Sequence, residues 1–508
     1  MSPHRTPRPG TATAEPAGTP GRPGWISDWR PEDPEFWEST GRPVARRNLW
    51  VSIFAEHLGF SVWLMWSVSS AYLLASGFDF TASQLFFLVA VPNLVGSLLR
   101  VPYTLAVPMF GGRNWTVVSA LLLLVPTGLF IWAVQHPTTP YWVFCLIAAT
   151  AGFGGGNFAS SMANINFFFP ARAKGAALGL NAAGGNVGVA LIQFGLPVVV
   201  GGAGVFGLVR ASDGGIHLAR AGWVYLVLAL VAAVLAFRFM DNLENAKASP
   251  REQLRVLGEK HTWIMSLLYI GTFGSFIGYS AAMPLLIKLN FFVPTPLPGG
   301  TGINFAYYAF LGALVGSITR PFGGWLADRF GGARVTCWVF AAMVAGTLAV
   351  LWTLTQLTPN PGADPAIALA NTEWFGLFLA FFLLVFAATG IGNGSTYRMI
   401  PTIWRTRALA AVDPAEQGDE QIRSHVLARA NAGASAAIGI IGAIGAIGGF
   451  AIPMTFGAPW VSDPTEAVRT AFAVFAGFYV LCGLVTWFVY LRRHLLVARF
   501  PSLAAAGV

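Results

Sequence analysis

The sequence contains two matching runs, Phe87-Leu-Val-Ala-Val-Pro-Asn-Leu-Val-Gly-Ser-Leu-Leu-Arg100 and Phe305-Ala-Tyr-Tyr-Ala-Phe-Leu-Gly-Ala-Leu-Val-Gly-Ser-Ile-Thr-Arg320. Each run is apolar, is long enough for a helix and ends on one arginine, and Phe-Gly-Gly follows each at the same distance, beginning at Phe110 and Phe330. An arginine inside a bilayer costs about 3 kcal/mol or more, so it needs a partner or a function. Two such arginines at equivalent points of a duplicated chain predict one anion held between two halves.

The composition indicates a polytopic membrane protein. Of 508 residues, 55% are hydrophobic and 10% are charged, and the mean hydropathy is +0.61. The alternating pattern of a membrane barrel is absent, which favours an all-α membrane protein. We predict twelve transmembrane helices in two pseudo-symmetric six-helix halves, at residues 48–76, 84–109, 115–135, 141–169, 176–200, 221–239, 263–288, 303–327, 335–357, 373–400, 428–455 and 470–491.

Basic residues are distributed unequally between the two sides of this predicted bundle. With twelve spans, both termini and the even-numbered connections lie on one side, and most of the 31 Lys and Arg residues fall there. The opposite side receives only Arg210, Arg220, Lys288 and Arg469. By the positive-inside rule we expect both termini to be cytoplasmic, in a multi-pass protein of the inner (cytoplasmic) membrane. The net charge of +9 therefore reflects topology and does not indicate a nucleic-acid partner.

The predicted domains are two helical bundles joined by a polar linker. The first residues are rich in Pro, Gly and Thr, so we expect the N-terminal cytoplasmic segment to be largely disordered. The boundaries are 1–45 for that segment, 46–240 for the first bundle, 241–262 for the cytoplasmic linker, 263–492 for the second bundle and 493–508 for a cytoplasmic tail.

No pattern in the sequence indicates an enzyme or a cofactor site. Walker, HExxH, CxxC and nucleophile-elbow patterns do not stand out, and Cys145, Cys337 and Cys482 lack metal or redox spacing. We therefore predict neither an ATP-driven pump nor an enzyme, and expect no cofactor and no metal.

One short motif follows the second arginine. Gly324-Trp-Leu-Ala-Asp328-Arg329-Phe-Gly331-Gly332 is similar to the G-x-x-x-D-R-x-G-G loop of the major facilitator superfamily. The small residues allow helices to approach closely, and Asp328 and Arg329 are suited to latch neighbouring helix ends. The first-half counterpart at 110–113 lacks the aspartate, so any latch there must differ. A simple structural turn is the alternative.

Three predicted spans are rich in glycine, which lets membrane helices pack at backbone distance. They contain Gly152-Phe-Gly-Gly-Gly-Asn157 in span four, Gly184-Gly-Asn186-Val-Gly188 in span five and Gly439-Ile-Ile-Gly442-Ala-Ile-Gly445 in span eleven. Packing explains most of the glycines. It does not explain the amides that accompany them, which need polar partners in an apolar helix; these are Asn157, Asn164, Asn181 and Asn186.

These stretches, together with Trp29-Arg-Pro-Glu-Asp-Pro34, resemble the nitrate/nitrite porter family of the major facilitator superfamily, over residues 26–492. The resemblance implies that an anion sits at the midplane between the halves, clamped by one arginine from helix two and one from helix eight. Arg100 and Arg320 match those two positions. The sequence departs from the family at Gly442, where a hydroxyl side chain is frequent, so a side-chain hydrogen bond from there is in doubt.

The resemblance also implies roles for other residues. Phe158 and Phe273 match the aromatic rings on the two faces of a flat anion, and Tyr269 matches a hydroxyl donor. Asn186 matches an amide donor, and Gly439 a backbone position close to the site. Taken without the family, Phe158 and Tyr269 read better as packing residues.

Glu56 and His57 are an adjacent acid and imidazole within the first span. Neighbouring residues point about 100° apart on a helix, so they cannot face one partner squarely. One interpretation is a proton-coupling site, because His titrates near neutrality and the environment of a buried Glu tunes it. The other is structural, with Glu56 offsetting an arginine and His57 bonded to a backbone carbonyl.

The sequence thus predicts a secondary active transporter of nitrate and/or nitrite, working by alternating access as a nitrate/proton symporter or a nitrate/nitrite exchanger. The expected partners are nitrate, nitrite, protons and the lipid bilayer, with a functional monomer. Guanidinium suits this ligand because it is a planar fork of donors that stays protonated. The alternatives are a carrier of another small monoanion such as formate, and a non-transporting anion sensor on the same scaffold.

Overall fold

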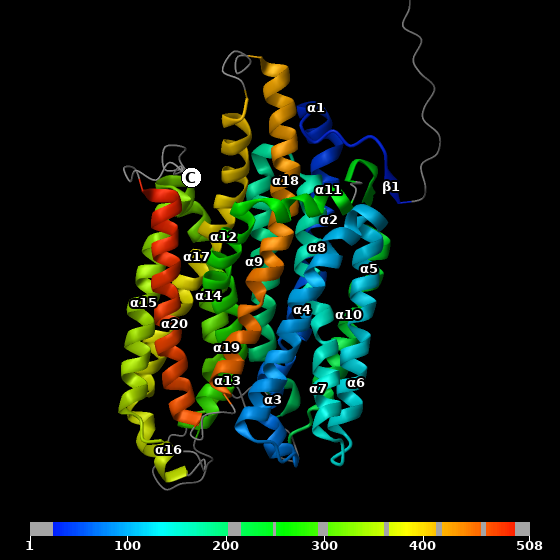
Figure 1. Cartoon of the computed structure of the whole chain (residues 1–508). Coiled ribbons are helices and arrows are strands. Elements are labelled where there is room, and N and C mark those ends of the chain that lie inside the picture. The colour runs from blue at the N-terminus through cyan, green and yellow to red at the C-terminus, as the bar shows by residue number, and fades with distance from the viewer. Residues whose placement is uncertain are drawn as a thin grey trace, which may run out of the picture.

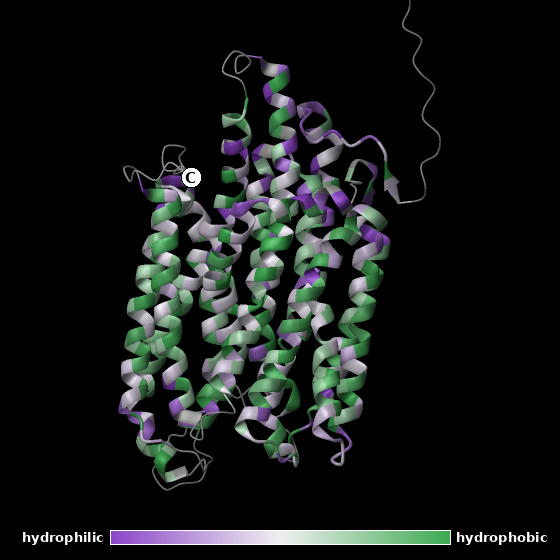
Figure 2. Ribbon diagram, viewed as in Figure 1, coloured by the Kyte–Doolittle hydropathy of each residue, from purple (hydrophilic) through white to green (hydrophobic). Residues whose placement is uncertain are grey.

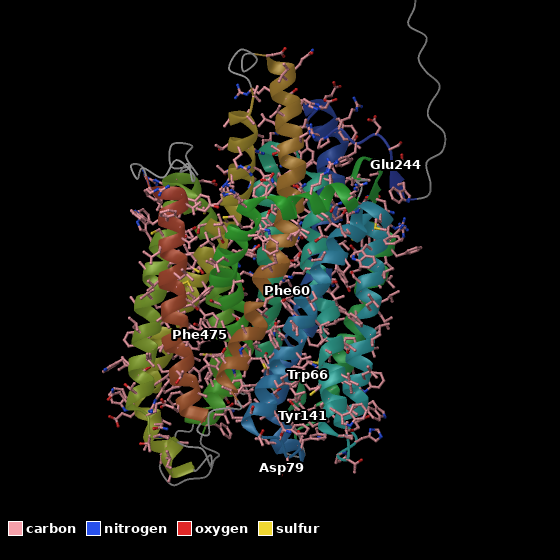
Figure 3. All side chains as sticks on the ribbon, in the orientation of Figure 1. Phe60, Trp66, Asp79, Tyr141, Glu244 and Phe475 are labelled. Carbon is pink, nitrogen blue, oxygen red and sulfur yellow. The ribbon has the colours of Figure 1, made fainter. Side chains whose placement is uncertain are left out.

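The computed structural model describes residues 24–201, 215–246, 250–292, 303–359, 365–412, 419–458 and 464–492. Long helices run side by side along one axis, so the predicted all-α class is confirmed (Figure 1). The two ends of this bundle differ. We call the end that carries residues 25–47 and 240–259 the termini face, and the opposite end, which carries Asp79 and residues 365–374, the far face (Figure 3). The predicted tail at 493–508 lies outside the described residues.

The first half consists of residues up to Phe239. Its helices are α1 (Pro34–Phe36), α2 (Arg42–Trp63), α3 (Met65–Leu73), α4 (Ala82–Phe110), α5 (Gly112–Leu122), α6 (Leu124–Val134), α7 (Tyr141–Thr150), α8 (Gly152–Phe168), α9 (Ala171–Val200) and α10 (Ala219–Phe239). A π-helical turn at Trp37–Gly41 and a 3-10 turn at Leu74–Ser76 complete it.

The second half begins with the linker. Its helices are α11 (Pro250–Leu254), α12 (Lys260–Tyr269), α13 (Ser275–Phe291), α14 (Phe305–Phe330), α15 (Gly332–Gln356), α16 (Pro365–Asn371), α17 (Phe375–Ala410), α18 (Glu420–Ala446), α19 (Gly448–Phe456) and α20 (Pro464–Thr486). Short 3-10 turns lie at Glu244–Ala246, Arg255–Gly258 and Thr372–Trp374, and π-helical turns at Ile270–Gly274 and Trp487–Leu491.

Within the described residues, eleven helical stretches are long and apolar enough to cross a membrane. The one predicted span that is missing from these eleven, at 303–327, corresponds to α14. Its 26 residues extend about 39 Å at 1.5 Å per residue, enough to cross a bilayer core of about 30 Å. Its apolar run is diluted by the arginine and the glycines discussed above. Hydrophobic residues cover the middle of the helices and polar ones gather toward the ends (Figure 2). The arrangement agrees with twelve spans.

Helix ends differ from the predicted spans at the termini face. The stretches Pro34–Ser76, Ala366–Ala410 and Gln421–Phe456 each extend beyond the predicted apolar segments. The extensions carry charged side chains. A prediction from hydropathy ends each span at these residues, whereas the helix itself continues into water. In Figure 1, α18 accordingly projects past the bundle at this face.

Part of the segment predicted to be largely disordered is folded. Strand β1 (Trp25–Ile26) pairs in parallel with β2 (Asn242–Leu243), so residues from both sides of the first bundle meet. The indole of Trp29 donates to the carbonyl of Phe167 at 3.1 Å and is 5% exposed. Residues 24–45 are folded because aromatic side chains there have an apolar surface to bury against. Residues 1–23 lie outside the described part of the chain.

Candidate anion-binding site

Arg100 lies in the middle of α4 and is completely buried. Its Nε donates to the carbonyl of Gly155 in α8 at 3.1 Å, and its Nη1 donates to the carbonyl of Gly442 in α18 at 3.0 Å. Its Nη2 is buried and has no hydrogen-bond partner among the described residues. One nitrogen of a fixed guanidinium is therefore left to bind something else.

Arg320 occupies the equivalent place in α14 and is 4% exposed. Both of its terminal nitrogens are buried and lack a hydrogen-bond partner within the described chain. Neither Arg320 nor Arg100 forms an ion pair with a described acidic residue. A buried charge left in this condition is costly, so the pair of arginines has the character of an anion-binding site.

Phe158 brings the two arginines to one place. The guanidinium carbon of Arg100 lies 4.7 Å from the centre of this ring, and that of Arg320 lies 5.4 Å from it. Arg100 also lies 4.8 Å from the ring centre of Phe273. Because α4 and α8 belong to the first half and Arg320 and Phe273 to the second, the site is built at the interface between the halves.

The aromatic rings form a stack within that interface. Phe158 and Phe273 have ring centres 5.9 Å apart and planes 23° apart, and Phe273 stacks on Tyr269 at 5.2 Å. Phe273 lies within the π-helical turn at Ile270–Gly274, which directly follows Tyr269. Such π-helical turns are frequent at functional sites. The buried hydroxyl of Tyr269 has no hydrogen bond of normal geometry among the described residues, and Arg320 and Arg100 are the charged groups that act on it. A flat anion between two rings needs about 7 Å from centre to centre, so the rings must part slightly to admit one.

A small cavity of ≈ 20 Å³ opens beside the stack. Chain direction places it on the side of the termini face. α4 runs toward that face, so Thr104 in the lining lies beyond Arg100; α18 runs away from it, so Ser435 in the lining lies before Gly442. Asn166 donates to the Ser435 hydroxyl at 2.9 Å and joins α8 to α18 across the cavity. A polar path thus approaches the arginines from the termini face.

Gly439 and Asn186, both predicted as site positions on glycine-rich helices, have different surroundings. Gly439 lines the cavity and packs so closely on α4 that an added Cβ would lie 2.6 Å from the Thr104 hydroxyl. Asn186 in α9 is fully buried and both its amide atoms lack hydrogen-bond partners among the described residues, so it makes no hydrogen bond to either arginine. Gly442, rather than Gly439, supplies the backbone carbonyl that holds Arg100.

Glu56 and His57 point to different neighbours, as adjacent helix residues must. One carboxylate oxygen of Glu56 accepts from the amide of Asn181 at 2.7 Å, while the other is buried without a hydrogen-bond partner among the described residues. Asn181 also bonds the Ser161 hydroxyl, which lies 2.9 Å from that of Ser52. Glu56 is therefore part of a buried polar chain that joins α2, α8 and α9.

The imidazole of His57 lies beside a backbone carbonyl, which is the contact expected in the structural interpretation. Its Nδ1 lies 3.3 Å from the carbonyl of Gly184 in α9. The ring is half-buried against the same helix that carries Asn181. His57 and Glu56 thus both bind α9, through different atoms.

The motif after Arg320 forms a latch with a partner that the sequence analysis missed. Asp328 pairs with Arg398 on α17, and Arg329 instead lies over Trp325, 5.7 Å from that ring's centre. Gly324 has open space where its own side chain would be, although its backbone nitrogen lies close to Gly394 of α17. The glycine whose missing side chain permits the close approach is Gly323, one residue earlier, which packs on the backbone of α17.

The first-half motif lacks the aspartate, and different side chains connect the helix ends there. Asp241, just beyond α10, accepts from Arg47 at 2.6 Å and from the Asn48 amide at 2.8 Å. The neighbouring Asn242 side chain accepts from the backbone of Asn114 at 3.3 Å. The linker therefore occupies the place at the first-half motif that Arg398 and α17 take at the second.

Sequence reasoning also missed Tyr397 and Trp63. The Arg320 guanidinium lies 5.4 Å from the ring centre of Tyr397, which also lines the cavity, and Arg100 lies 5.3 Å from that of Trp63. A signal for Tyr397 was present, because the stretch Gly390-Ile-Gly-Asn393 in α17 repeats the glycine-and-amide pattern that precedes Phe158.

Comparison with known proteins places the chain among membrane transporters. The family model described as "Major Facilitator Superfamily" matches residues 49–418. The chain is 41% identical over 475 residues to "Nitrate/nitrite transporter NarU" of Salmonella typhimurium, covering 92% of this chain and 96% of that protein. It is 37% identical over 404 residues to "Probable nitrate/nitrite antiporter NarK2" of Thermus thermophilus, covering 76% and 85%.

Solved structures support the fold. A "D-xylose-proton symporter" matches with a TM-score of 0.56 at 15% identity, covering 87% of this chain and 97% of that one. A bacterial homologue of the human lysosomal transporter Spinster, in an inward-facing and unoccupied conformation, matches with a TM-score of 0.54 at 14% identity, covering 88% and 97%. At these identities the likeness concerns the fold alone.

Proposed function

Because the chain belongs to the Major Facilitator Superfamily and, within it, to the nitrate/nitrite porters, we propose that it carries nitrate and nitrite across the cytoplasmic membrane by alternating access. It acts as a transporter and not as an enzyme. The termini face is the cytoplasmic one, as the distribution of basic residues favours.

The pair of buried arginines is the observation that carries this proposal. One guanidinium from each half contacts Phe158, and three of their terminal nitrogens have no hydrogen-bond partner among the described residues. Those nitrogens suit the oxygens of a small planar monoanion. Two like charges facing each other in a dry interface repel, and a bound anion removes the repulsion. Binding therefore draws the two halves together, which is the step that an alternating-access carrier requires.

The other site residues orient the ligand in this proposal. Phe158 and Phe273 lie parallel enough to cover the two faces of a flat anion once they separate by about 1 Å. The unpartnered Tyr269 hydroxyl and Asn186 amide supply further donors. A tetrahedral anion does not fit between parallel rings, so the site selects by shape.

Proton coupling is the finer part of the proposal. Exchange of nitrate for nitrite needs no titrating group, whereas symport needs one that communicates with the anion. Glu56 is buried in the polar chain with Asn181 and Ser161, and Arg100 and Arg320 are the charged groups that act on it electrostatically. We therefore propose that nitrate enters together with protons. The carrier functions as a monomer.

Uptake of isotopically labelled nitrate into proteoliposomes tests the function. We expect saturable uptake that unlabelled nitrate and nitrite suppress at similar concentrations and that sulfate does not. Uptake suppressed better by formate than by nitrite would replace this substrate with another monoanion. Nitrate binding to the purified protein without any flux would indicate a sensor.

A further inference from the structure

The interface between the halves contains a second feature with the character of an anion site, on the far face. Lys288 lies in the last turn of α13, half-buried, and its ammonium donates to the main-chain carbonyl of Ala71 in α3 of the other half. It forms no ion pair with a described acidic residue. Its charge is therefore matched by a carbonyl dipole and not by a counter-charge.

Lys288 contacts the other half of the protein, and the other described basic residues of the far face do not. Arg220 is exposed on α10, away from the interface. Arg469 binds the carbonyls of Leu354 and Leu357 within the second half and pairs with Glu466. Lys288 alone among the three bridges the two halves, at a contact that must break when the halves separate on the far face.

The two helices joined by this contact, α3 and α13, carry buried polar atoms that lack hydrogen-bond partners among the described residues. The hydroxyls of Ser69, Ser70 and Tyr72, on either side of Ala71, and of Ser280 on α13 are buried and unpartnered within the described residues. A buried polar group left unpaired costs about 1–3 kcal/mol. Three of these groups adjoin Ala71 in the chain, and Ser280 lies two turns before Lys288 on α13. The two helices that the Lys288 contact joins therefore carry polar groups that are buried here and become solvated when the halves separate.

These groups align with the candidate anion-binding site along the helix axes. Gln193 lies two turns beyond Asn186 on α9, and its amide donates across the interface to the carbonyl of Ser280 at 2.6 Å. Lys288 lies 15 residues beyond Phe273, about 22 Å along the helix. The order from the far face inward is therefore Lys288, then Gln193 with Ser280, then the arginine pair.

We propose that Lys288 is the centre of a second anion-binding station, which receives the substrate monoanion at the far face when the two halves separate there. The inference rests on the proposed function and names a further binding residue for it. In the closed state the ammonium holds the Ala71 carbonyl. When that contact opens, the ammonium exchanges the carbonyl for an anion oxygen, a stronger partner because both groups are charged.

A hydrogen-bonded gate without anion binding is the competing role, and substitutions separate the two. Lys288→Gln keeps a donor for the Ala71 carbonyl and removes the charge, whereas Lys288→Met removes both. Lys288→Arg keeps both. Arg220→Gln is the matched control, because it removes one positive charge from the same side at an exposed position.

The measurement is the nitrate concentration for half-maximal transport, taken separately with nitrate offered to each face in right-side-out and everted membrane vesicles. We expect Lys288→Gln and Lys288→Met to raise this value about tenfold at the far face and to leave it unchanged at the termini face. Arg220→Gln should match the wild type, and Lys288→Arg should recover most of the far-face value that Lys288→Gln loses.

Three results would overturn the station. One is a normal Lys288→Gln variant beside an impaired Lys288→Met variant, which indicates a gate alone. The second is an equal change at both faces, and the third is no change in any Lys288 variant. A wild-type protein that moves no nitrate in either vesicle would instead overturn the proposed function.

Discussion

Arg100 of the first half donates a hydrogen bond of 3.0 Å from Nη1 to the main-chain carbonyl of Gly442 in the second half. This bond ties a candidate substrate ligand directly to the glycine-rich helix α18. An anion bound at the neighbouring Nη2 would share one guanidinium with this tie to α18. Movement of α18 relative to α4 is thereby linked to occupancy of the site.

The two neighbouring glycines of α18 should respond differently to a methyl group. A Cβ at Gly439 would lie 2.6 Å from the Thr104 hydroxyl, whereas one at Gly442 would have Arg100 Nη1 as its nearest neighbour at 3.7 Å. Overpacking costs about 1–3 kcal/mol, so Gly439→Ala should lower nitrate transport about tenfold by holding α4 and α18 apart. Gly442→Ala is the control and should transport normally. Equal activity of the two variants would show that contact at Gly439 does not limit the cycle.

Arginine-to-lysine substitutions test the planar fork. Arg100 uses Nε and Nη1 for two carbonyls at an angle that a lysine's single nitrogen cannot reproduce. We expect Arg100→Lys and Arg320→Lys each to weaken nitrate binding at least about tenfold, although the charge is kept. Binding measured by isothermal titration and uptake at matched expression give the result. Near-normal behaviour of either variant removes that arginine from the clamp.

Alanine at the aromatic rings tests selection by shape. Phe158 contacts both guanidiniums and Phe273 contacts one, and each cation–π contact is worth about 0.5–2 kcal/mol. Phe158→Ala should therefore weaken nitrate binding more than Phe273→Ala, and both should let larger anions compete. Phe144→Leu is a suitable control, because Phe144 packs against Trp66 in the first-half core. Retained affinity and selectivity in both alanine variants would leave the rings a packing role only.

The ion pair at the termini face should affect transport more than stability. Asp328 and Arg398 are 55% and 47% exposed, and an exposed pair contributes only about 0–1 kcal/mol. We expect Asp328→Asn to slow nitrate exchange several-fold with little change in melting temperature. The swap Asp328→Arg with Arg398→Asp should restore the rate. Arg329→Gln, which removes a neighbouring charge that makes no described ion pair, should be neutral; impairment there as large as in Asp328→Asn would count against the latch.

The sequence allowed prediction of the helices and of the two arginines for a physical reason, whereas the roles of Phe158 and Phe273 followed only from the resemblance to a family. Apolar length and duplicated arginines are properties of the chain itself, so the spans and the equivalence of Arg100 and Arg320 could be found without coordinates. Contacts between segments distant in the chain could not. Arg398 looked like one more cytoplasmic charge, and only the packing of α17 on α14 brings it to Asp328.

Backbone chemistry was the other limit. A glycine shows its lack of side chain in the sequence but does not show where its carbonyl points. Gly439 and Gly442 lie one turn apart on α18, yet the former packs on Thr104 and the latter accepts from Arg100. Likewise the folding of residues 24–45 depends on aromatic contacts with Phe167 and its neighbours, which composition alone does not reveal.

The two proposed transport modes, proton symport and anion exchange, differ in whether they need the carboxyl group of Glu56. It contacts Asn181 on α9, and the polar chain continues through Ser161 on α8 to Ser52 on its own helix; Arg100 and Arg320 are the charged groups that act on it. A carboxyl in that place gains or loses its proton as an anion changes the field of the arginines. Removing the titrating group should therefore uncouple protons from nitrate without removing the anion site.

We expect Glu56→Gln to abolish nitrate uptake driven by an imposed pH gradient in proteoliposomes, while exchange against internal nitrite stays within about twofold of the wild type. Glutamine keeps the shape and the acceptor for Asn181, so loss of folding is avoided. His57→Asn is the second variant, and it should keep gradient-driven uptake if His57 only binds the Gly184 carbonyl. Wild-type uptake that ignores the pH gradient and depends wholly on internal nitrite would refute symport. Glu56 would then serve as a counter-charge to the arginines, and the carrier would be an exchanger.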